Sequence, residues 1–201
     1  GNTFTVAMVL EGVRRAARLM EKKLEACKVT IIGGNGDIGG ACARILVSQV
    51  AQLTITSRTN EHLPAAKKLL SGLGKAVIKT SCDNNHAVRD ADIVIAAASS
   101  TTAIVEFSSF KTGAIVCDVG YPKNLSYAKC DREDILIFSG GIASIPSSFE
   151  IDFDLGLPSK NVLYGCFSEA IILALEEKFQ RFSWGKGNIS PESVNYIRDL
   201  G

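Results

Sequence analysis

The sequence "TIIGGNGDIGGACARIL", residues 30–46, carries the strongest structural signal in this chain. An apolar run typical of a buried strand leads into a glycine-rich turn and then into a segment with helical spacing. Gly34, Gly36 and Gly39 satisfy the pattern G-x-G-x-x-G, and a related pattern, G-x-x-G-x-x-G, begins at Gly33. Such glycines permit a tight turn, let backbone N–H groups approach a pyrophosphate and let the helix pack on the strand. The turn predicts a dinucleotide-binding site, and a purely structural glycine turn is the plainer alternative.

The expected cofactor contacts extend over the whole turn and over two later loops. The N-terminus of the helix favours an anion, because its N–H groups are unpaired and its dipole is positive there. Loops at the carboxyl ends of parallel strands line the same crevice. The predicted cofactor-binding residues from these parts are Gly33, Gly34, Asn35, Gly36, Asp37, Ile38, Gly39, Ala98, Ser99, Gly120 and Tyr121.

The end of the second strand indicates which dinucleotide is bound. Sites for NAD carry an Asp or Glu near this point to bind the ribose 2′-hydroxyl. Here the strand runs into Ser57, Arg58 and Thr59, which offer a guanidinium and two hydroxyls for a 2′-phosphate. NADP(H) is therefore the predicted cofactor, with these three residues as further contacts. The alternative is that Arg58 is only a solvated loop residue.

The rest of the chain alternates apolar runs with helical or polar stretches. Strand patterns occur at residues 28–34, 52–57, 76–81, 92–99, 113–120 and 134–141, and helical patterns at residues 39–49 and 62–73. Nearly continuous Val/Ile runs joined by helices indicate a parallel sheet covered on both faces. We predict an α/β fold: a doubly wound, mainly parallel Rossmann sheet with an N-terminal helix and C-terminal helices packed on it.

The expected organisation has three parts. Residues 1–27 form an N-terminal helix, at about 5–25, that leads into the domain. Residues 28–158 form the NADP-binding Rossmann domain, and residues 159–201 form a helical segment that carries Cys166. The chain begins "GNTFT" without a methionine, and we expect it to be a fragment of something longer on that side.

Composition excludes several classes of partner and site. The 201 residues carry a net charge of +1 without long blocks of either sign, which gives no reason to expect nucleic acid or an anionic membrane. No stretch approaches the roughly 20 apolar residues that a membrane helix needs. Six cysteines show neither C-x-x-C pairs nor Cys/His ligand spacing, so we expect no metal site and a reducing, cytoplasmic environment.

Cys166 begins the apolar helical stretch "CFSEAIILALEEKF", residues 166–179, and two interpretations are open. A free cysteine is often buried as a small hydrophobe. Alternatively it is a nucleophile, and a helix N-terminus would stabilise its thiolate. If the helix starts near Asn161 or Tyr164, Cys166 lies in the first turn. If Ser159 is the cap, Cys166 lies in the second turn and the benefit fades.

The loop "CDVGYPKNL", residues 117–125, follows the fifth strand and is expected to face the nicotinamide end of the crevice. Asp118, Tyr121, Lys123 and Asn124 would then approach the reacting centre, and Lys123 would supply positive charge near Cys166. The plainer interpretation is a turn chosen for its glycine and proline. Backbone N–H groups of "SGG", residues 139–141, are candidates to stabilise an oxyanion.

Several motifs together resemble the long-chain acyl-(acyl-carrier-protein) reductases. They are "GNTFT", "GGNGDIGG", "DVGYPKNL", "SGGI", "EIDF", "CFSEAIILALEEKF" and "FSWGKGNIS", in order over nearly the whole chain. The resemblance implies an NADPH-dependent reduction of an acyl thioester, carried by acyl carrier protein or CoA, to an aldehyde. It further implies a cysteine-bound acyl intermediate on Cys166. The wider resemblance is to the cofactor domain of the shikimate and quinate dehydrogenases.

Two departures from the reductase pattern stand out. The reductases continue "GG" with a short segment that contains a histidine, whereas this chain has "GGIASIPSSFEIDF". Its histidines, His62 and His86, lie on the nucleotide half, so Cys166 has no evident imidazole partner. The reductases also carry a further N-terminal part associated with the acyl substrate, and this chain begins just after it.

Two other functions compete with this one. A shikimate- or quinate-dehydrogenase-like enzyme would oxidise a small alcohol by direct hydride transfer and would need no cysteine. However, Phe4 replaces that family's Asp after "GNT", and its catalytic Lys/Asp pair comes largely from an N-terminal domain. A non-catalytic NADP-binding module would bind nucleotide without turnover. The acyl-chain length, a homo-oligomeric state and activity of the fragment alone are left open by the sequence.

Overall fold

The computed structural model describes all residues except 126–130, 146–154, 158, 180–181 and 184–186. Its helices are α1 (Thr3–Leu19), α2 (Asp37–Leu46), α3 (Leu63–Ser71), α4 (Asn84–Val88), α5 (Gly165–Leu175) and α6 (Pro191–Leu200), with short 3-10 turns at Leu24–Ala26 and Phe107–Ser109. Its strands are β1 (Lys28–Ile32), β2 (Gln52–Thr56), β3 (Val77–Ser81), β4 (Ile93–Ala96), β5 (Ile115–Asp118), β6 (Leu136–Ser139), β7 (Ile142–Ser144) and β8 (Val162–Tyr164).

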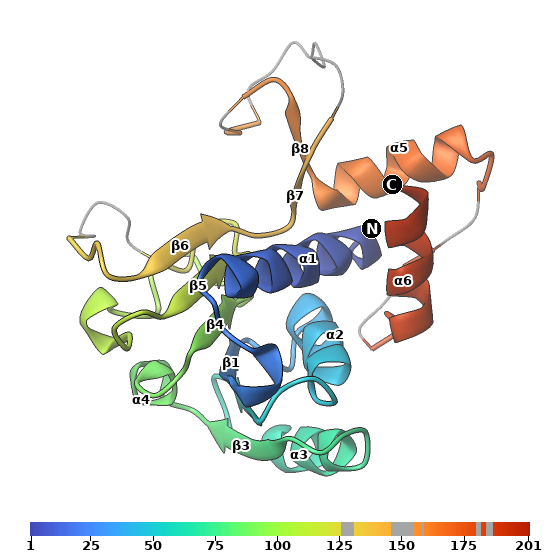
Figure 1. Cartoon of the computed structure of the whole chain (residues 1–201). Coiled ribbons are helices and arrows are strands. Elements are labelled where there is room, and N and C mark those ends of the chain that lie inside the picture. Colours follow the sequence, from blue (N-terminus) through green and yellow to red (C-terminus); the bar gives the residue numbers. More distant parts are fainter. Residues whose placement is uncertain (126–130, 146–154, 158, 180–181, 184–186) are drawn as a thin grey trace.

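A six-stranded sheet in the order β3-β2-β1-β4-β5-β6 forms the centre of the molecule (Figure 1). Every neighbouring pair in it is parallel. The order runs outward from β1 in both directions, which is the doubly wound Rossmann topology and confirms the predicted fold. The carboxyl ends of β1 and β4 therefore lie side by side, where this topology places its ligand crevice.

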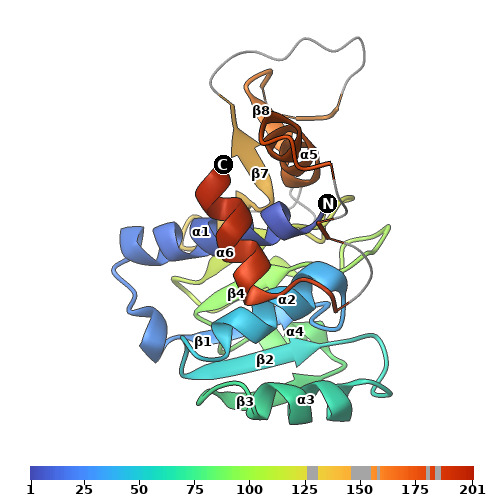
Figure 2. The same cartoon turned by 90° about the vertical axis from the view of Figure 1, so that its right-hand side faces the viewer.

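The strand residues alternate between two apolar layers, which explains their nearly continuous hydrophobic runs. Ile31, Ile95 and Cys117 face a layer that α1, α2 and α3 cover. Ile32 and Val116 face the opposite layer, which is built with residues from α4 and the turn at Phe107–Ser109. Figure 2 shows α1 and α2 stacked over one face of the sheet. Both faces are buried, as a parallel sheet requires.

Helix α1 packs into the same core as the sheet. Its inward face, including Val6, Val9, Leu10 and Val13, is at most 1% exposed. The sequence pattern predicted a helix over about 5–25, but the helix ends at Leu19. The reason is local: Glu21 adopts a left-handed conformation, and the N–H of Lys22 bonds back to the carbonyl of Ala17.

The C-terminal segment corrects one expectation. Residues from about 159 were predicted to be helical, but Val162–Tyr164 form β8, which pairs antiparallel with β7. β-branched and aromatic side chains suit this short ribbon. The helix begins only afterwards, at Gly165, with Tyr164 as its N-cap.

Helix α4 was not expected from the sequence. The side chain of Asp83 caps it by accepting the N–H of His86, and this N-cap is the signal that could have indicated a helix. Among the described residues, no helix is both long and apolar enough to cross a membrane.

Shortening Leu10 tests whether α1 is part of the core. Leu10→Ala should lower the free energy of unfolding by about 2–5 kcal/mol, since it opens a cavity at a position that is 1% exposed. Leu19→Ala on the same helix is the control, because Leu19 is 71% exposed and its loss should cost less than about 0.5 kcal/mol. Chemical denaturation measures both, and equal effects would contradict the packing of α1.

Candidate dinucleotide and thiol site

The glycine turn is held by backbone contacts that leave little room for side chains. Gly33 adopts φ +73°, and its carbonyl accepts the N–H of Gly36 at 2.8 Å. The N–H of Gly34 donates to the carbonyl of Thr56 at 3.1 Å, which ties the turn to the end of β2. Gly36 is the N-cap of α2, so the helix opens directly from the turn.

The glycines form a cradle that a Cβ would fill. A Cβ on Gly39 would overlap the carbonyl of Gly33 and lie 3.2 Å from the Cα of Gly34. One on Gly36 would lie 3.1 Å from the same carbonyl. The backbone can therefore approach a ligand closely only because these positions carry hydrogen, which fits a pyrophosphate on the N-terminus of α2.

Three buried polar atoms at or near this cradle have no hydrogen-bond partner in the described part of the chain. They are the Asn35 amide nitrogen, the Asp37 Oδ1 atom and the Thr3 hydroxyl. Buried polar groups usually have partners, so orphaned ones indicate a ligand or solvent in the native protein. The Asn35 amide can donate to a phosphate, whereas Asp37 Oδ1 can only accept a hydrogen bond; the glycine cradle together with Asn35 fits a dinucleotide.

Ser57, Arg58 and Thr59 follow directly from β2, on the strand end that holds the turn. The N–H of Ser57 donates to the Ser81 carbonyl at 3.3 Å, while Arg58 and Thr59 are exposed. Their place beside the glycine turn matches the position from which a 2′-phosphate would be read. The fold thus fits either dinucleotide, and the choice between them rests on these side chains.

The loops after β4 and β5 are fastened together by one side chain. The amide of Asn124 donates to the Ala98 carbonyl at 2.9 Å and accepts the Ala98 N–H at 3.0 Å. Asn124 is fully buried. Gly33 in turn packs against Ala98, because a Cβ on Gly33 would lie 2.8 Å from its Cα. The predicted contacts Gly33 and Ala98 are therefore adjacent, and Ser99 follows them as an exposed residue.

Asp118 and Asn124 are not placed as the sequence suggested. Both are fully buried rather than facing a substrate. The Asp118 carboxylate accepts the N–H groups of Gly120, Asn124 and Leu125 at 3.1–3.3 Å. A polar residue in a loop can serve the backbone as readily as a ligand, and sequence alone does not separate these roles. These two side chains shape the loop.

Tyr121 projects from the loop after β5, whereas the Lys123 side chain turns back onto this loop. The Lys123 ammonium donates to the Asp118 carbonyl at 3.1 Å, so its charge is held over the loop. Tyr121 is 70% exposed, and its ring lies 5.4 Å from that of Tyr164, centroid to centroid. Since Tyr164 is the N-cap of α5, this contact brings the loop to the start of that helix.

Cys166 is exposed and lies in the first turn of α5, one residue after Gly165. The helix starts at the later of the positions considered from sequence, so the thiol lies where the helix dipole favours negative charge. Gly165 allows α5 to meet α1 closely, because a Cβ there would lie 2.9 Å from the Cα of Thr5. The Cys166 side chain is therefore exposed to solvent rather than buried in the core.

Buried cysteines elsewhere contrast with Cys166. Burial raises the pKa of the Cys42 thiol to about 12, and it raises the pKa of Cys117 as well. Cys42 lies on α2 and Cys117 on β5, and both thiols are buried in the core layer that α1 also covers. Of the other described cysteines, Cys82 is exposed and Cys27 is buried. Exposure and helix position together distinguish Cys166.

The "SGG" segment is only partly available as an oxyanion site. The N–H of Gly140 donates to the Asp118 carbonyl at 2.9 Å, so it is already used. The Gly141 carbonyl accepts the N–H of Gly165 at 2.7 Å and thus anchors the start of α5. The segment after it, 146–154, includes "EIDF" and lies outside the described residues.

Residues before α1 join the cradle to α5. The Asn2 amide donates to Asp37 Oδ2, in the first turn of α2, at 2.9 Å. The neighbouring Gly1 nitrogen donates to the Cys166 carbonyl at 3.1 Å. Sequence reasoning missed this role of Asn2, although Asn2 belongs to the motif "GNTFT". The helix that would hold the phosphates and the helix that carries the thiol are thus bridged by two consecutive residues.

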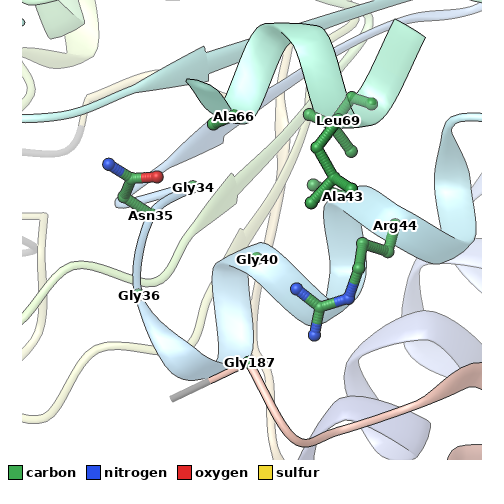
Figure 3. A pocket seen from close by; sticks show the side chains of 10 residues that line it. Gly34, Asn35, Gly36, Gly40, Ala43, Arg44, Ala66, Leu69 and Gly187 are labelled. Carbon is green, nitrogen blue, oxygen red and sulfur yellow. The ribbon is translucent and has the colours of Figure 1, made fainter. Parts of the chain in front are cut away.

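A separate cavity of about 120 Å³ lies between α2 and α3 (Figure 3). Helix α3 contributes Ala66 and Leu69 from one side, and α2 contributes Ala43 and Arg44 from the other. Its lining also includes Gly34, Asn35 and Gly36 but no residue of the loops after β4 and β5. The glycine turn therefore borders both this cavity and the dinucleotide site that the sequence predicts. Among described residues, no three His, Cys, Asp or Glu side chains gather as metal ligands.

Comparisons with known proteins show what the chain is similar to. The sequence model described as "Shikimate / quinate 5-dehydrogenase" matches residues 14–139. The long-chain acyl-[acyl-carrier-protein] reductase of Synechococcus elongatus is 30% identical over 98% of this chain and 58% of its own length. Aminotransferase PigE of a Serratia species is 26% identical over 92% of this chain and 22% of its own length. The chain thus spans less than two thirds of either curated relative, and the resemblance seen in the motifs is confirmed.

Solved structures support the fold. Glutamyl-tRNA reductase from Methanopyrus kandleri superposes with a TM-score of 0.54 at 16% identity, over 66% of this chain and 34% of its own. A dipicolinate synthase chain from Bacillus halodurans gives 0.54 at 16% identity, over 69% and 47%. At such identities the likeness concerns the fold alone.

Adding one methyl group tests the cradle. Gly39→Ala should weaken NAD(P)(H) binding strongly and lower the free energy of unfolding by about 1–3 kcal/mol, since its Cβ meets the Gly33 carbonyl. Gly72→Ala is the matched control, because its Cβ would lie 3.5 Å from the nearest atom at an ordinary φ. Calorimetric titration and thermal unfolding measure both. Normal NAD(P)(H) affinity in Gly39→Ala would contradict the assignment.

Proposed function

The chain belongs to the shikimate / quinate 5-dehydrogenase family, and we propose that it is the NADP(H)-binding, nucleophile-bearing part of a reductase that converts an acyl thioester to an aldehyde. The NAD(P)-binding Rossmann fold of this chain is of the type found in oxidoreductases. The similarity to an acyl-carrier-protein reductase supports an acyl thioester as the substrate class. The single observation that carries the proposal is the exposed Cys166 in the first turn of α5, bridged to the first turn of α2 by Gly1 and Asn2.

The first step of the proposed reaction is acyl transfer. The Cys166 thiolate attacks the carbonyl carbon of the acyl thioester and forms a new carbon–sulfur bond. The carrier leaves as a thiolate, which takes up the proton that Cys166 has lost. Because a thiolate is a good leaving group, this step does not need the imidazole that an amide substrate would require, and the absence of a histidine near Cys166 in the sequence does not block it.

The second step reduces the acyl group held on Cys166. NADPH, when bound, supplies a hydride to the carbonyl carbon. The resulting oxyanion collapses, the carbon–sulfur bond breaks, and the aldehyde leaves with the Cys166 thiolate restored. Positive charge from Lys123, held over the loop after β5, would stabilise that oxyanion if the loop closes on the substrate.

Preference for NADP(H) is part of the proposal. Arg58 and the two hydroxyl residues beside it, Ser57 and Thr59, stand where NAD sites place a carboxylate. A guanidinium attracts a 2′-phosphate, whereas a carboxylate would repel it. The proposed carrier is acyl carrier protein or CoA. A cytoplasmic location and a homo-oligomeric assembly stay predictions.

A second function is favoured by the family model, which describes dehydrogenases that act on shikimate or quinate. Such an enzyme would move a hydride directly between a small alcohol and the nicotinamide. It would not need Cys166, so Cys166→Ala would leave its turnover unchanged. The same substitution would abolish the acyl transfer proposed above.

Acyl transfer to Cys166 can be observed by intact mass. The full-length protein incubated with acyl-CoA or acylated carrier protein should gain the mass of one acyl group, and Cys166→Ser should gain none. Cys82→Ser is the matched control and should still gain the acyl group, because Cys82 is also exposed but does not lie at the start of α5. An adduct that persists in Cys166→Ser, or none in the wild type, would contradict the proposal.

Removing the Arg58 guanidinium tests cofactor preference. Arg58→Ala should raise the dissociation constant for NADPH roughly 10- to 100-fold, because one charge-assisted contact is worth about 1.5–3 kcal/mol. Affinity for NADH should change little. Arg15→Ala serves as the control, since Arg15 is an exposed arginine on α1. Equal losses for NADPH and NADH would show that Arg58 does not read the 2′-phosphate.

A further inference from the structure

Residues 2–4 make hydrogen bonds to three distant parts of the chain at once. The Asn2 side chain donates to Asp37 of α2 at 2.9 Å, and its backbone N–H donates to the Ser183 hydroxyl at 2.8 Å. Two residues later, the N–H of Phe4 donates to the Glu169 carboxylate of α5 at 2.8 Å. The segment therefore joins the first turn of α2 to the first turns of α5.

Glu169 is the residue of α5 that accepts the hydrogen bond from Phe4 near the thiol. It lies one helical turn after Cys166 and is 2% exposed. Its second oxygen accepts the Ser183 hydroxyl at 3.2 Å. Two hydrogen-bond donors hold this buried carboxylate, and the Gly1 nitrogen lies 3.6 Å from its Oε1 atom, so Glu169 fixes the first turns of α5 against the start of α1. We call Asn2, Phe4, Asp37, Glu169 and Ser183 the N-terminal link.

The link ends at the place where a dinucleotide phosphate would lie. Asp37 is the first residue of α2, and the other oxygen of its carboxylate is buried without a partner among the described residues. An anionic phosphate on this helix start repels a free carboxylate. The positive end of the Asn2 N–H dipole, 2.9 Å from Asp37 Oδ2, offsets part of this repulsion. A bound dinucleotide should therefore favour the linked arrangement over one in which Asn2 has let go.

We propose that the N-terminal link couples occupancy of the dinucleotide site to the presentation of Cys166. Asn2, Glu169 and Ser183 are positioning residues, since they act on the thiol only through α5. A ligand that binds the linked arrangement better shifts the protein toward it, and the shift equals the difference in affinity. In the structure the link is formed and Cys166 is exposed at the start of α5. The inference rests on the dinucleotide site of the proposed function.

Alkylation of Cys166 by iodoacetamide measures this presentation without any turnover. The probe is ADP-ribose 2′-phosphate, which keeps the pyrophosphate but has no nicotinamide ring to shield the thiol. Peptide mapping by mass spectrometry follows Cys166 separately from the other cysteines. With the full-length wild-type protein, saturating probe should raise the alkylation rate about five-fold or more, the lower range of ordinary coupling between sites.

Three variants separate coupling from other effects. Asn2→Ala should still bind the probe but lose the rate increase, because α2 is then detached from α5. Ser183→Ala removes the Ser183 bridge between Asn2 and Glu169 without touching α2, but the hydrogen bond from Phe4 to Glu169 remains, so it should reduce the increase rather than abolish it. Gln49→Ala is the matched control: it breaks the contact of Gln49 with Arg14 toward the opposite end of α1, 3.1 Å in the structure, and should keep the increase.

The outcomes distinguish this inference from the proposed function. The coupling is overturned if the wild-type alkylation rate does not rise with the probe. It is also overturned if Asn2→Ala and Ser183→Ala both keep the full wild-type rise. Failure of the probe to bind overturns both the coupling and the proposed cofactor site. A link-dependent rise in alkylation, with no acyl adduct on Cys166 from any acyl thioester, supports the coupling and overturns only the proposed chemistry.

Discussion

The position of α2 relative to the sheet depends on the close contact between Gly39 of α2 and the carbonyl of Gly33. This contact holds the helix start directly over the end of β1, at a distance that no side chain would permit. The same turn is bound to β2 through Thr56 and lies against the loop after β4 at Ala98. Because these strand ends are neighbours in the doubly wound sheet, one close backbone approach creates both the anion-binding helix start and the floor of the crevice.

The proposed reactive part of the site is joined to this frame by a second set of close contacts. Gly141 and Gly165 let α5 begin beside α1, and the ribbon of β7 and β8 delivers Cys166 to the first turn of that helix. The buried side chains of Asp118 and Asn124 hold the loop after β5 by hydrogen bonds to backbone groups. Cofactor loop, shaping loop and thiol helix thus come from three separate stretches of sequence, and α1 packs between them.

Much of this was accessible from sequence because its signals are local. The Val/Ile runs and the glycine spacing around residues 30–46 predicted the parallel sheet and the nucleotide turn. The sequence left the start of α5 open between Ser159, Asn161 and Tyr164, because β8 forms only by pairing with β7, about twenty residues earlier in the chain. Burial of Asp118 and Asn124 depends on backbone partners that no periodicity reveals. The roles of Asn2 and Glu169 were missed for a similar reason, since their contacts reach residues 35 and 165 positions away.

A crystal structure of the full-length protein with NADP⁺ bound would examine the account at its core. We expect the pyrophosphate on the first turn of α2, the 2′-phosphate against Arg58 and the nicotinamide ring turned toward Cys166 at the start of α5. A dinucleotide bound elsewhere, or one whose nicotinamide points away from α5, would contradict the account.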